Sequence, residues 1–426
     1  MTASGGPSLS PPPLRDDCFA LPAGVDWTPV DQAMERLRAS LHAVTAQRLV
    51  PLDQADGRVL AEPVRALRSN PPMPNSAVDG YGFAHAATGD GAQDLPLMQG
   101  RAAAGAPFDG TVPTGHAIRI LTGAILPDGV DTVVLEEDVA TDGTRIAFRG
   151  PVRAGANTRK AGEDVAEGAP VFDAGRRLIA PDLALLAALG LAQVKVHDPL
   201  RVGVLSTGDE LVPAGTPAGH GQIHDANRPM LLALLRRWGH EAVDMGHVGD
   251  DRAALSDRLD TARSKCDALL TSGGASAGDE DHVSALLGET GSLRNWRIAI
   301  KPGRPLALAL WQGMPVFGLP GNPVAAFVCT LLFARPAFAT LEGAGWHEPA
   351  SFTVPAAFEK NKKPGRREYL RARLDDQGRA EVFASEGSGR ISGLTWATGL
   401  VELDDGARHV QPGDPVRFLP YGSFGL

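Results

Sequence analysis

Cysteine is scarce in this chain: Cys18, Cys266 and Cys329 are the only three in 426 residues, and they lie far apart. No CxxC or similar spacing occurs, which excludes the common zinc and disulfide frameworks and indicates a reducing compartment. An HExxH motif is also absent, so zinc peptidase chemistry has no support in the sequence. Cys266 and Cys329 lie in apolar contexts, which favours buried thiols over nucleophiles.

Long apolar runs and aromatic residues are also few. No segment reaches the roughly 18 apolar residues of a membrane helix, and the N-terminal stretch MTASGGPSLSPPPLRDD lacks the apolar core of a signal peptide. Aromatic residues make up 5% of the chain, so its cores are expected to be mainly aliphatic. A formal net charge of −9 disfavours nucleic acid and membrane partners. We therefore expect a cytoplasmic protein that binds small molecules, with a disordered tail at residues 1–25.

Glycine and proline are abundant instead, with 50 and 34 residues, which indicates many turns. The length predicts about three domains at roughly 150 residues each. An amphipathic helix is predicted in TPVDQAMERLRASLHAVTA, with Thr28 as N-cap and Pro29 at the first helical position. Short β-type runs between PP, DG and PDG turns predict an inserted β module at residues 66–150. A second helix follows in APDLALLAALG, so residues 26–65 and 151–198 are predicted to form one split helical or mixed domain.

Residues 199–345 alternate between strand and helix patterns. This rhythm predicts an α/β domain whose mainly parallel sheet is covered by helices. Ligands of such sheets bind beyond the carboxyl ends of the strands, where STGDE, SGGASAGDED and LPGNP all occur. Residues 346–426 return to β-type patterns and are predicted to form a C-terminal β domain. The expected fold class is therefore multidomain α/β plus β.

One stretch, TSGGASAGDEDHV, places several glycines directly before Asp279, Glu280 and Asp281. Glycines let an anion approach backbone N–H groups, whereas clustered carboxylates repel that anion unless a cation lies between them. The stretch therefore predicts a metal–phosphate site. Capping of the following helix by the acidic residues is the alternative.

The motif RIAIKPGRP supplies the positive charge for such a site. Lys301 and Arg304 flank a Pro-Gly turn, and Arg297 lies earlier on the same predicted strand face as Lys301. Three cations beside an acidic loop favour oxyanion binding over ordinary surface charge. In FGLPGNP, Asn322 is predicted to cap the helix VAAFVCTLLFA, whose N-terminus can bind an anion. A rigid structural turn explains the two prolines of this motif equally well.

Taken together, these motifs resemble the molybdopterin molybdenumtransferase family, which inserts molybdate into adenylylated molybdopterin and includes the C-terminal domain of gephyrin. The resemblance covers nearly the whole chain after the tail. It rests on seven strings in the family's order: PMPNSAVDGYGF, RILTGAILPDGVDTVVLEEDV, GANTRKAGEDV, VLSTGDEL, TSGGASAGDEDH, IKPGRPLAL and FGLPGNPVAAFV.

This resemblance implies an α/β domain similar to the molybdopterin adenylyltransferases. It also implies a homodimer with the substrate cleft between subunits, release of AMP as the metal is inserted, and Mg²⁺ as the assisting cation. The pathway implies transient contacts with a molybdopterin adenylyltransferase and with molybdoenzymes.

The resemblance also assigns roles to individual residues. Those implied to be catalytic are Asp79, Thr122, Glu210, Asp250, Asp281 and Lys301, of which Glu210, Asp250 and Asp281 would hold the cation. Those implied to bind substrate or molybdate are Gly273, Gly274, Ser276, Arg297, Arg304, Pro305, Pro320, Pro323, Arg371 and Ser388. Arg297 and Arg304 stand where other members have lysine, so the geometry of oxyanion binding is expected to differ.

Some of these residues have a second interpretation. Asp79 suits an Asp-Gly turn, Asp251 next to Asp250 suits a helix N-cap, and Ser392 is a rival to Ser388. Two other functions also stay open. A molybdopterin adenylyltransferase would not need the β module or the C-terminal domain. A non-catalytic scaffold like gephyrin would not need the full set of Asp79, Glu210, Asp250, Asp281 and Lys301.

Overall fold

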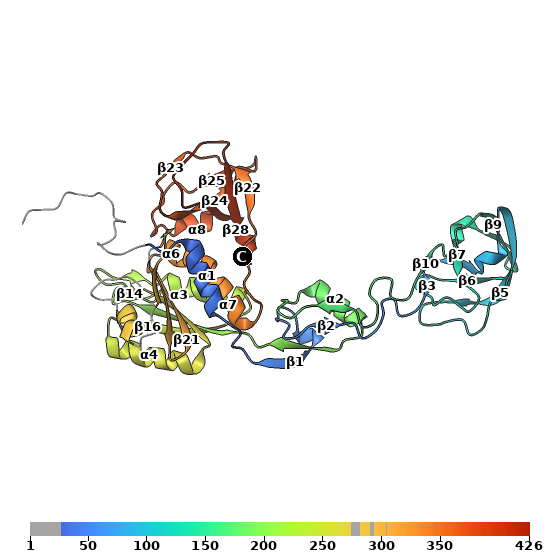
Figure 1. The fold of residues 1–426 in the computed structure, drawn as a ribbon, viewed down its shortest axis with the longest axis horizontal. Helices are drawn as coiled ribbons and strands as arrows, with labels where there is room; N and C mark the ends of the chain where they lie inside the picture. The colour runs from blue at the N-terminus through green and yellow to red at the C-terminus, as the bar shows by residue number, and fades with distance from the viewer. Residues whose placement is uncertain (1–26, 274–281, 290–293, 304) are drawn as a thin grey trace, which may run out of the picture. The chain divides into compact units, whose positions relative to one another are not determined.

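The computed structural model describes residues 27–273, 282–289, 294–303 and 305–426 (Figure 1). The chain forms two compact units. The first unit comprises Met1–Thr45 with Pro199–Leu426, and the second unit comprises Ala46–Asp198.

The first unit is built on a six-stranded sheet with the order β16-β13-β17-β21-β20-β18. Four of its strands run parallel to one another: β13 (Arg201–Thr207), β16 (Glu241–Val248), β17 (Ala268–Ser272) and β21 (Met314–Leu319). Two antiparallel strands complete one edge: β20 (Pro305–Trp311) and β18 (Arg294–Arg297). The predicted α/β fold with a mainly parallel sheet is therefore confirmed.

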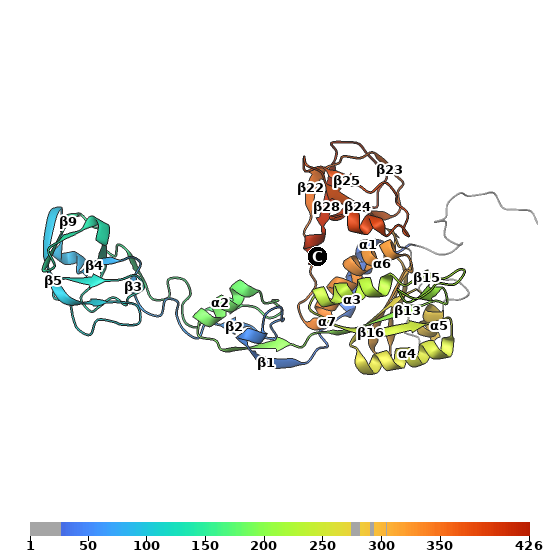
Figure 2. The same ribbon diagram turned by 180° about the vertical axis from the view of Figure 1, so that it is seen from behind.

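Helices cover both faces of this sheet, as Figures 1 and 2 show. One face packs in a common core with α1 (Val30–Ser40), α3 (Asn227–Arg237), α6 (Pro323–Cys329) and α7 (Arg335–Glu342). The other face packs against α4 (Arg252–Lys265) and α5 (His282–Glu289). In α4, Leu255, Leu259 and Ala262 recur at intervals of four and three residues, which places all three on the buried side.

The first helix differs from its sequence prediction at both ends. Pro29 is the N-cap of α1, and Thr28 instead forms a β-bridge with Ile298. The helix ends at Ser40. Its buried residues Val30, Ala33 and Leu37 belong to the core of the α/β domain. We had expected this helix to belong to the split N-terminal domain, and its apolar face explains why it packs in the first unit instead.

The 20-residue helical segment Pro323–Glu342 is long and apolar enough to cross a membrane, with a mean hydropathy of 1.8. However, 83% of its most apolar window is buried inside the protein. Phe327, Phe333 and Phe338 all lie in the core that covers the sheet. The apolar composition of this segment is therefore accounted for by the protein core.

Cys266 and Cys329 are buried and free, as predicted. Burial raises the pKa of the Cys266 thiol to about 11 and that of Cys329 to about 12. A thiol that stays protonated at neutral pH is a poor nucleophile. Cys18 lies outside the described residues.

The C-terminal β domain also belongs to the first unit and has its own apolar core, which includes Phe358, Leu370, Val401 and Phe418. Its sheet has the order β19-β24-β26-β28-β22, with β25 paired to β24. These strands are β19 (Ile300–Lys301), β22 (Phe352–Pro355), β24 (Arg367–Leu374), β25 (Ala380–Val382), β26 (Gly399–Leu403) and β28 (Pro415–Pro420). The edge strand β19 comes from the α/β part of the chain, so the two domains share a sheet.

The second unit contains the predicted β module, a six-stranded sheet with the order β7-β4-β6-β5-β9-β8. Its strands are β4 (Gly80–Phe83), β5 (Gly91–Ala102), β6 (Ala117–Ile120), β7 (Thr132–Leu135), β8 (Ala140–Thr141) and β9 (Arg145–Gly150). Strands before and after this module pair with each other: β1 (Gln47–Pro51) with β12 (Gln193–His197), β2 (Val64–Arg65) with β11 (Pro170–Phe172), and β3 (Asn75–Ser76) with β10 (Thr158–Arg159). This pairing confirms a split domain with an inserted module.

The helix α2 (Ala180–Ala188) of the second unit begins with an ion pair between the buried Asp182 and the exposed Arg176. Asp182 accepts two hydrogen bonds from Arg176, at 2.9 and 2.8 Å, and one from the Ile179 backbone N–H at 3.1 Å. The hydrogen bond from Arg176 is the main reason why the pKa of Asp182 lies below its ordinary value. The charged form of Asp182 therefore stabilises the folded state.

Replacing Asp182 by asparagine is expected to lower the free energy of unfolding by about 2 kcal/mol at pH 7, the scale of hydrogen bonds to a charged group. The contribution is complete above the unfolded pKa of about 3.9 and is lost as the pH falls through the lower folded pKa. Urea unfolding at pH 7, 5 and 3 should show the difference from wild type shrinking at the lowest pH. The exposed Asp173 offers a matched control, Asp173→Asn. A difference that stays constant with pH would contradict the role of the charge.

Candidate functional site

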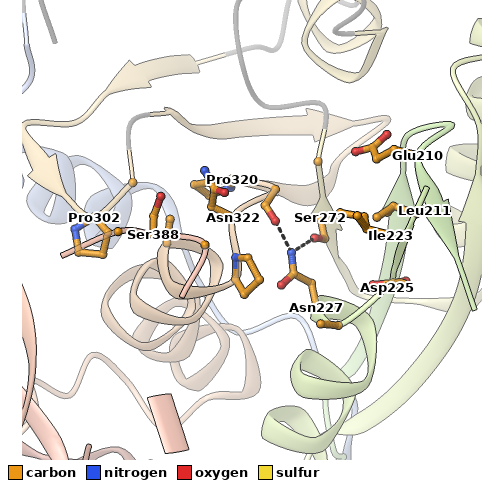
Figure 3. Close-up of a pocket in the computed structure, with 18 of the residues that line it drawn as sticks. Glu210, Leu211, Ile223, Asp225, Asn227, Ser272, Pro302, Pro320, Asn322 and Ser388 are labelled. Carbon is orange, nitrogen blue, oxygen red and sulfur yellow. Dashed lines mark hydrogen bonds between the residues drawn. The ribbon is translucent and has the colours of Figure 1, made fainter. Parts of the chain in front are cut away.

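A pocket of about 1000 Å³ lies at the carboxyl ends of the parallel strands of the first unit. It is lined by residues that follow β13, β17 and β21, by the start of α3, and by a loop of the C-terminal domain. In Figure 3, Glu210 and Ser388 lie on opposite sides of this pocket, with Asn227 and Ser272 between them. Several residues implied by the sequence line it: Glu210, Gly273, Lys301, Pro320, Pro323 and Ser388.

Glu210 follows β13 and Asp250 follows β16, and the two side chains differ in whether they line the pocket. Glu210 lines the pocket. Asp250 is not among its described lining residues, and it pairs with Asp209 instead. The Asp250 backbone N–H donates to Asp209 Oδ1 at 3.0 Å, and the Asp209 backbone N–H donates to Asp250 Oδ2 at 3.4 Å. Asp251 accepts from the N–H groups of Ala253 and Ala254 and is the N-cap of α4, the alternative that its position favoured.

Glu210 is suited to hold Mg²⁺, because this ion prefers carboxylate and phosphate oxygens. Within the described part of the chain, no three Asp, Glu, His or Cys residues form a group that could hold a metal ion. The expected third ligand Asp281 lies outside the described residues, as do Gly274, Ser276, Asp279 and Glu280. Since Mg²⁺ is usually bound by one or two carboxylates together with substrate phosphates, Glu210 fits as one of its ligands.

Lys301 lines the pocket as part of an ion-pair cluster, here called the Lys301 cluster, formed by Lys301, Lys360, Glu368 and Glu386. Lys301 Nζ lies 2.5 Å from Glu386 Oε2 and 3.5 Å from Glu368 Oε1. Lys360 Nζ contacts Glu386 Oε1 and lies 3.1 Å from Glu368 Oε2. Burial alone would raise the pKa of Glu386, but hydrogen bonds from the two lysines outweigh it and lower the pKa.

The cationic motif around Lys301 does not form one continuous strand, contrary to our expectation. Arg297 ends β18 and pairs with Pro305 in the sheet of the α/β domain. Lys301 lies in β19, which pairs with β24 in the sheet of the C-terminal domain. A shared strand face for Arg297 and Lys301 is therefore wrong, because the chain changes sheets between them. Arg304 lies outside the described residues.

Arg371 in β24 organises the loop that carries Ser388. Its side chain is buried, with 4% of the residue exposed. The guanidinium donates to the carbonyls of Arg390 at 2.6 Å, Gly387 at 3.3 Å and Ser385, and it lies 4.9 Å from the Phe383 ring centre. Arg371 lines a smaller pocket of about 200 Å³ together with Lys301 and Lys360. Its implied role in molybdate binding stays a prediction.

The loop that carries Ser388 also closes the N-terminus of α6. The Ser388 carbonyl accepts from the Val324 backbone N–H at 3.1 Å. Asn322 is the N-cap residue, but its side chain makes no capping hydrogen bond. Ser388 therefore supplies the cap that we had expected from Asn322. The rival Ser392 begins α8 (Ser392–Trp396) and is not among the described residues that line the pocket.

Sequence reasoning missed a polar group at the start of α3. Asn227 Nδ2 donates to Ser272 Oγ at 2.7 Å and to the Gly321 carbonyl at 2.7 Å, as Figure 3 shows. Asp225 accepts from Ser206 Oγ at 2.6 Å and from the Arg228 side chain at 3.1 Å. These contacts tie together the ends of β13, β17 and β21. The polar string HDANR before an amphipathic helix was the available signal.

The second unit brings Asp79 and Thr122 together. Asp79 Oδ1 accepts from the Thr122 backbone N–H at 2.6 Å and from its hydroxyl at 2.7 Å. These bonds, led by the one from the backbone, hold the pKa of Asp79 below its ordinary value. Gly80 is required beside it, because a Cβ there would lie 1.9 Å from the Val134 carbonyl oxygen across the β4–β7 pair. The family resemblance implied Asp79 and Thr122 as separate residues, and in the structure they are in direct contact.

Comparison with known families covers most of the chain. Residues 28–190 match the family described as "MoeA N-terminal region (domain I and II)". Residues 203–340 match "Probable molybdopterin binding domain", and residues 353–421 match "MoeA C-terminal region (domain IV)".

Individual relatives are similar over almost their full length. The molybdopterin molybdenumtransferase of Haemophilus influenzae is 36% identical over 400 residues, which cover 92% of this chain and 98% of that protein. The molybdopterin molybdenumtransferase 2 of Mycobacterium tuberculosis is 34% identical, covering 91% and 98%. The crystal structure of the molybdopterin biosynthesis moeA protein from Pyrococcus horikoshii matches with a TM-score of 0.81 and 28% identity, covering 93% of this chain and 100% of that one. On this similarity, the chain belongs to the molybdopterin molybdenumtransferase family.

Proposed function

We propose that this protein inserts molybdate into adenylylated molybdopterin, breaks the phosphoanhydride bond of that substrate, and releases AMP. The observation that supports this best is the pocket at the strand ends, where Glu210, Lys301 and Ser388 converge from two domains. A pocket of about 1000 Å³ is large enough for a pterin nucleotide. Its mixed charges suit a substrate that combines phosphates with an oxyanion.

The residues of the pocket would divide the work as follows. Lys301 would offset the negative charge of the oxyanion. Gly273 turns the chain at the end of β17 with φ of +96°, and a Cβ there would lie 2.6 Å from the Thr207 carbonyl oxygen. Glycine is therefore required where the ends of β13 and β17 approach each other at the pocket. Mg²⁺, held in part by Glu210, would act as a Lewis acid at the phosphoanhydride.

The proposal is tested by incubating the protein with adenylylated molybdopterin and measuring AMP by chromatography. We expect AMP release that requires molybdate and stops when EDTA removes divalent cations. Formation of adenylylated molybdopterin from ATP and molybdopterin would favour an adenylyltransferase. Tight substrate binding without release would favour a scaffold.

We also propose that the protein acts in the cytoplasm as a homodimer, with transient contacts to a molybdopterin adenylyltransferase and to molybdoenzymes. The dimer is what the family resemblance implies, with a substrate cleft that combines parts of two subunits. Light scattering at micromolar concentration should therefore give twice the chain mass of 44.5 kDa. A mass equal to the single chain would contradict the dimer.

A further inference from the structure

Glu386 forms an ion pair with Lys301, at the place where the proposed function requires an oxyanion to bind. Its carboxylate bridges both lysines of the Lys301 cluster, with one oxygen on Lys301 and the other on Lys360. Glu386 also lines both the large pocket and the small one. The side chain of Glu386 is 45% exposed, whereas that of Glu368 is 7% exposed. Of the two carboxylates, Glu386 is thus the one that water and ions can reach.

The backbone around Glu386 is fixed on both sides. Arg371 donates to the carbonyls of Ser385 and Gly387, and Val324 donates to the carbonyl of Ser388. These bonds tie the loop to β24 and to α6. The Glu386 carboxylate can therefore leave the two lysines by rotation of its side chain alone, while the backbone of the loop stays in place.

Charge balance explains what such a rotation would do. The Lys301 cluster contains two lysines and two glutamates, so its formal charge is zero with Glu386 in place. A neutral cluster attracts a dianion weakly. If the carboxylate of Glu386 turns away, Lys301, Lys360 and the buried Glu368 keep a formal charge of +1, which attracts an oxyanion into the space that the carboxylate leaves.

We infer that the Glu386 carboxylate is an internal competitor for the oxyanion site at Lys301, which a tetrahedral dianion such as molybdate must displace in order to bind. This inference rests on the proposed function and adds a residue that sets oxyanion affinity. A competitor of this kind lowers the affinity for every anion, and a dianion overcomes it best, because two lysines attract its larger charge more strongly than that of a monoanion. Glu386 thus acts as a specificity residue without taking part in bond breaking.

The test is calorimetric titration of sodium molybdate into the full-length protein, comparing wild type with Glu386→Gln. Removing one charge about 4 Å from the anion is expected to tighten binding by about fivefold or more. Glu381→Gln is the matched control, because Glu381 lies in the same domain, is 42% exposed and pairs with Arg373 at 2.8 Å. That control should bind molybdate as wild type does. Glu386→Ala and the thermal unfolding midpoints of all variants check that folding is retained.

The outcomes separate this inference from the proposed function. The inference is supported if both Glu386 variants bind molybdate more tightly than wild type and Glu381→Gln does not. It is supported more strongly if the Glu386 variants bind molybdate and wild type does not. Equal or weaker affinity in folded Glu386 variants, with molybdate still bound by wild type, overturns the inference and leaves the proposed function standing. Binding by no variant at millimolar molybdate overturns the inference together with the oxyanion site.

Discussion

Replacing Lys301 by alanine is expected to lower molybdate-dependent AMP release by about 100- to 1,000-fold, the usual effect of removing one group that stabilises developing negative charge. Lys301 is only 23% exposed and lies at the edge of the large pocket. In the variant, Glu386 keeps Lys360 as its partner but faces the pocket without Lys301. The site would then repel an oxyanion. The measurement is the rate of AMP release under saturating substrate, at several molybdate concentrations.

The matched control for this experiment is Lys265→Ala. Lys265 lies in the last turn of α4 and is exposed, so the same change of charge is made away from the pocket. Its rate should stay within about twofold of wild type, since distant surface charges are screened. If Lys301→Ala retained full activity at low molybdate, Lys301 would have no part in oxyanion binding.

Replacing Arg371 by alanine is expected to lower the free energy of unfolding by about 3 kcal/mol or more. The variant is also expected to lose most of its molybdate-dependent AMP release. The guanidinium satisfies three backbone carbonyls of the loop that carries Glu386 and Ser388. Each hydrogen bond from a charged donor contributes about 1.5–3 kcal/mol. Without these bonds, the loop loses the position that brings Ser388 to the pocket. Urea unfolding and AMP release should therefore both respond.

Arg371→Lys separates positioning from charge. Lysine keeps the positive charge but cannot reproduce the planar set of donors that holds carbonyls at several points. If Arg371 acts mainly by holding the loop, the lysine variant should remain defective and show a raised KM for molybdate. Recovery of activity by lysine would indicate direct contact with the anion instead. Arg373→Ala on the same strand is the control and should cost under about 1 kcal/mol, because its ion pair with Glu381 is exposed.

The elements that periodicity could predict were those with strong local patterns. The helix α2 lies within the stretch APDLALLAALG that predicted it, and α4 buries Leu255, Leu259 and Ala262, which recur at helical intervals. The parallel strands were visible as apolar runs followed by polar motifs. These patterns depend on neighbours in sequence, so one sequence is sufficient to show them.

The features that were missed depend on partners far along the chain. Nothing local shows that Thr28 bridges to Ile298, or that the chain leaves one sheet after Arg297 and enters another at Ile300. In the same way, the pairing of Lys301 with Glu386 joins residues 85 positions apart. Long-range contacts of this kind also decide whether a charged side chain is free to bind a ligand. For this reason, motif matching identified Lys301 but did not identify Glu386, with which it pairs.

The strand exchange at β19 has a consequence for how the chain can be divided. Ile300 and Lys301 pair with Arg367 and Glu368, and the Arg367 backbone N–H donates to the Ala299 carbonyl at 2.8 Å. A fragment that began at residue 346 would keep the C-terminal core but leave this stretch of β24 as an open edge. Open edges recruit strands from other molecules. A C-terminal fragment that begins at the domain boundary visible in the sequence is thus expected to self-associate, because it lacks β19, which covers this edge of β24 in the full chain.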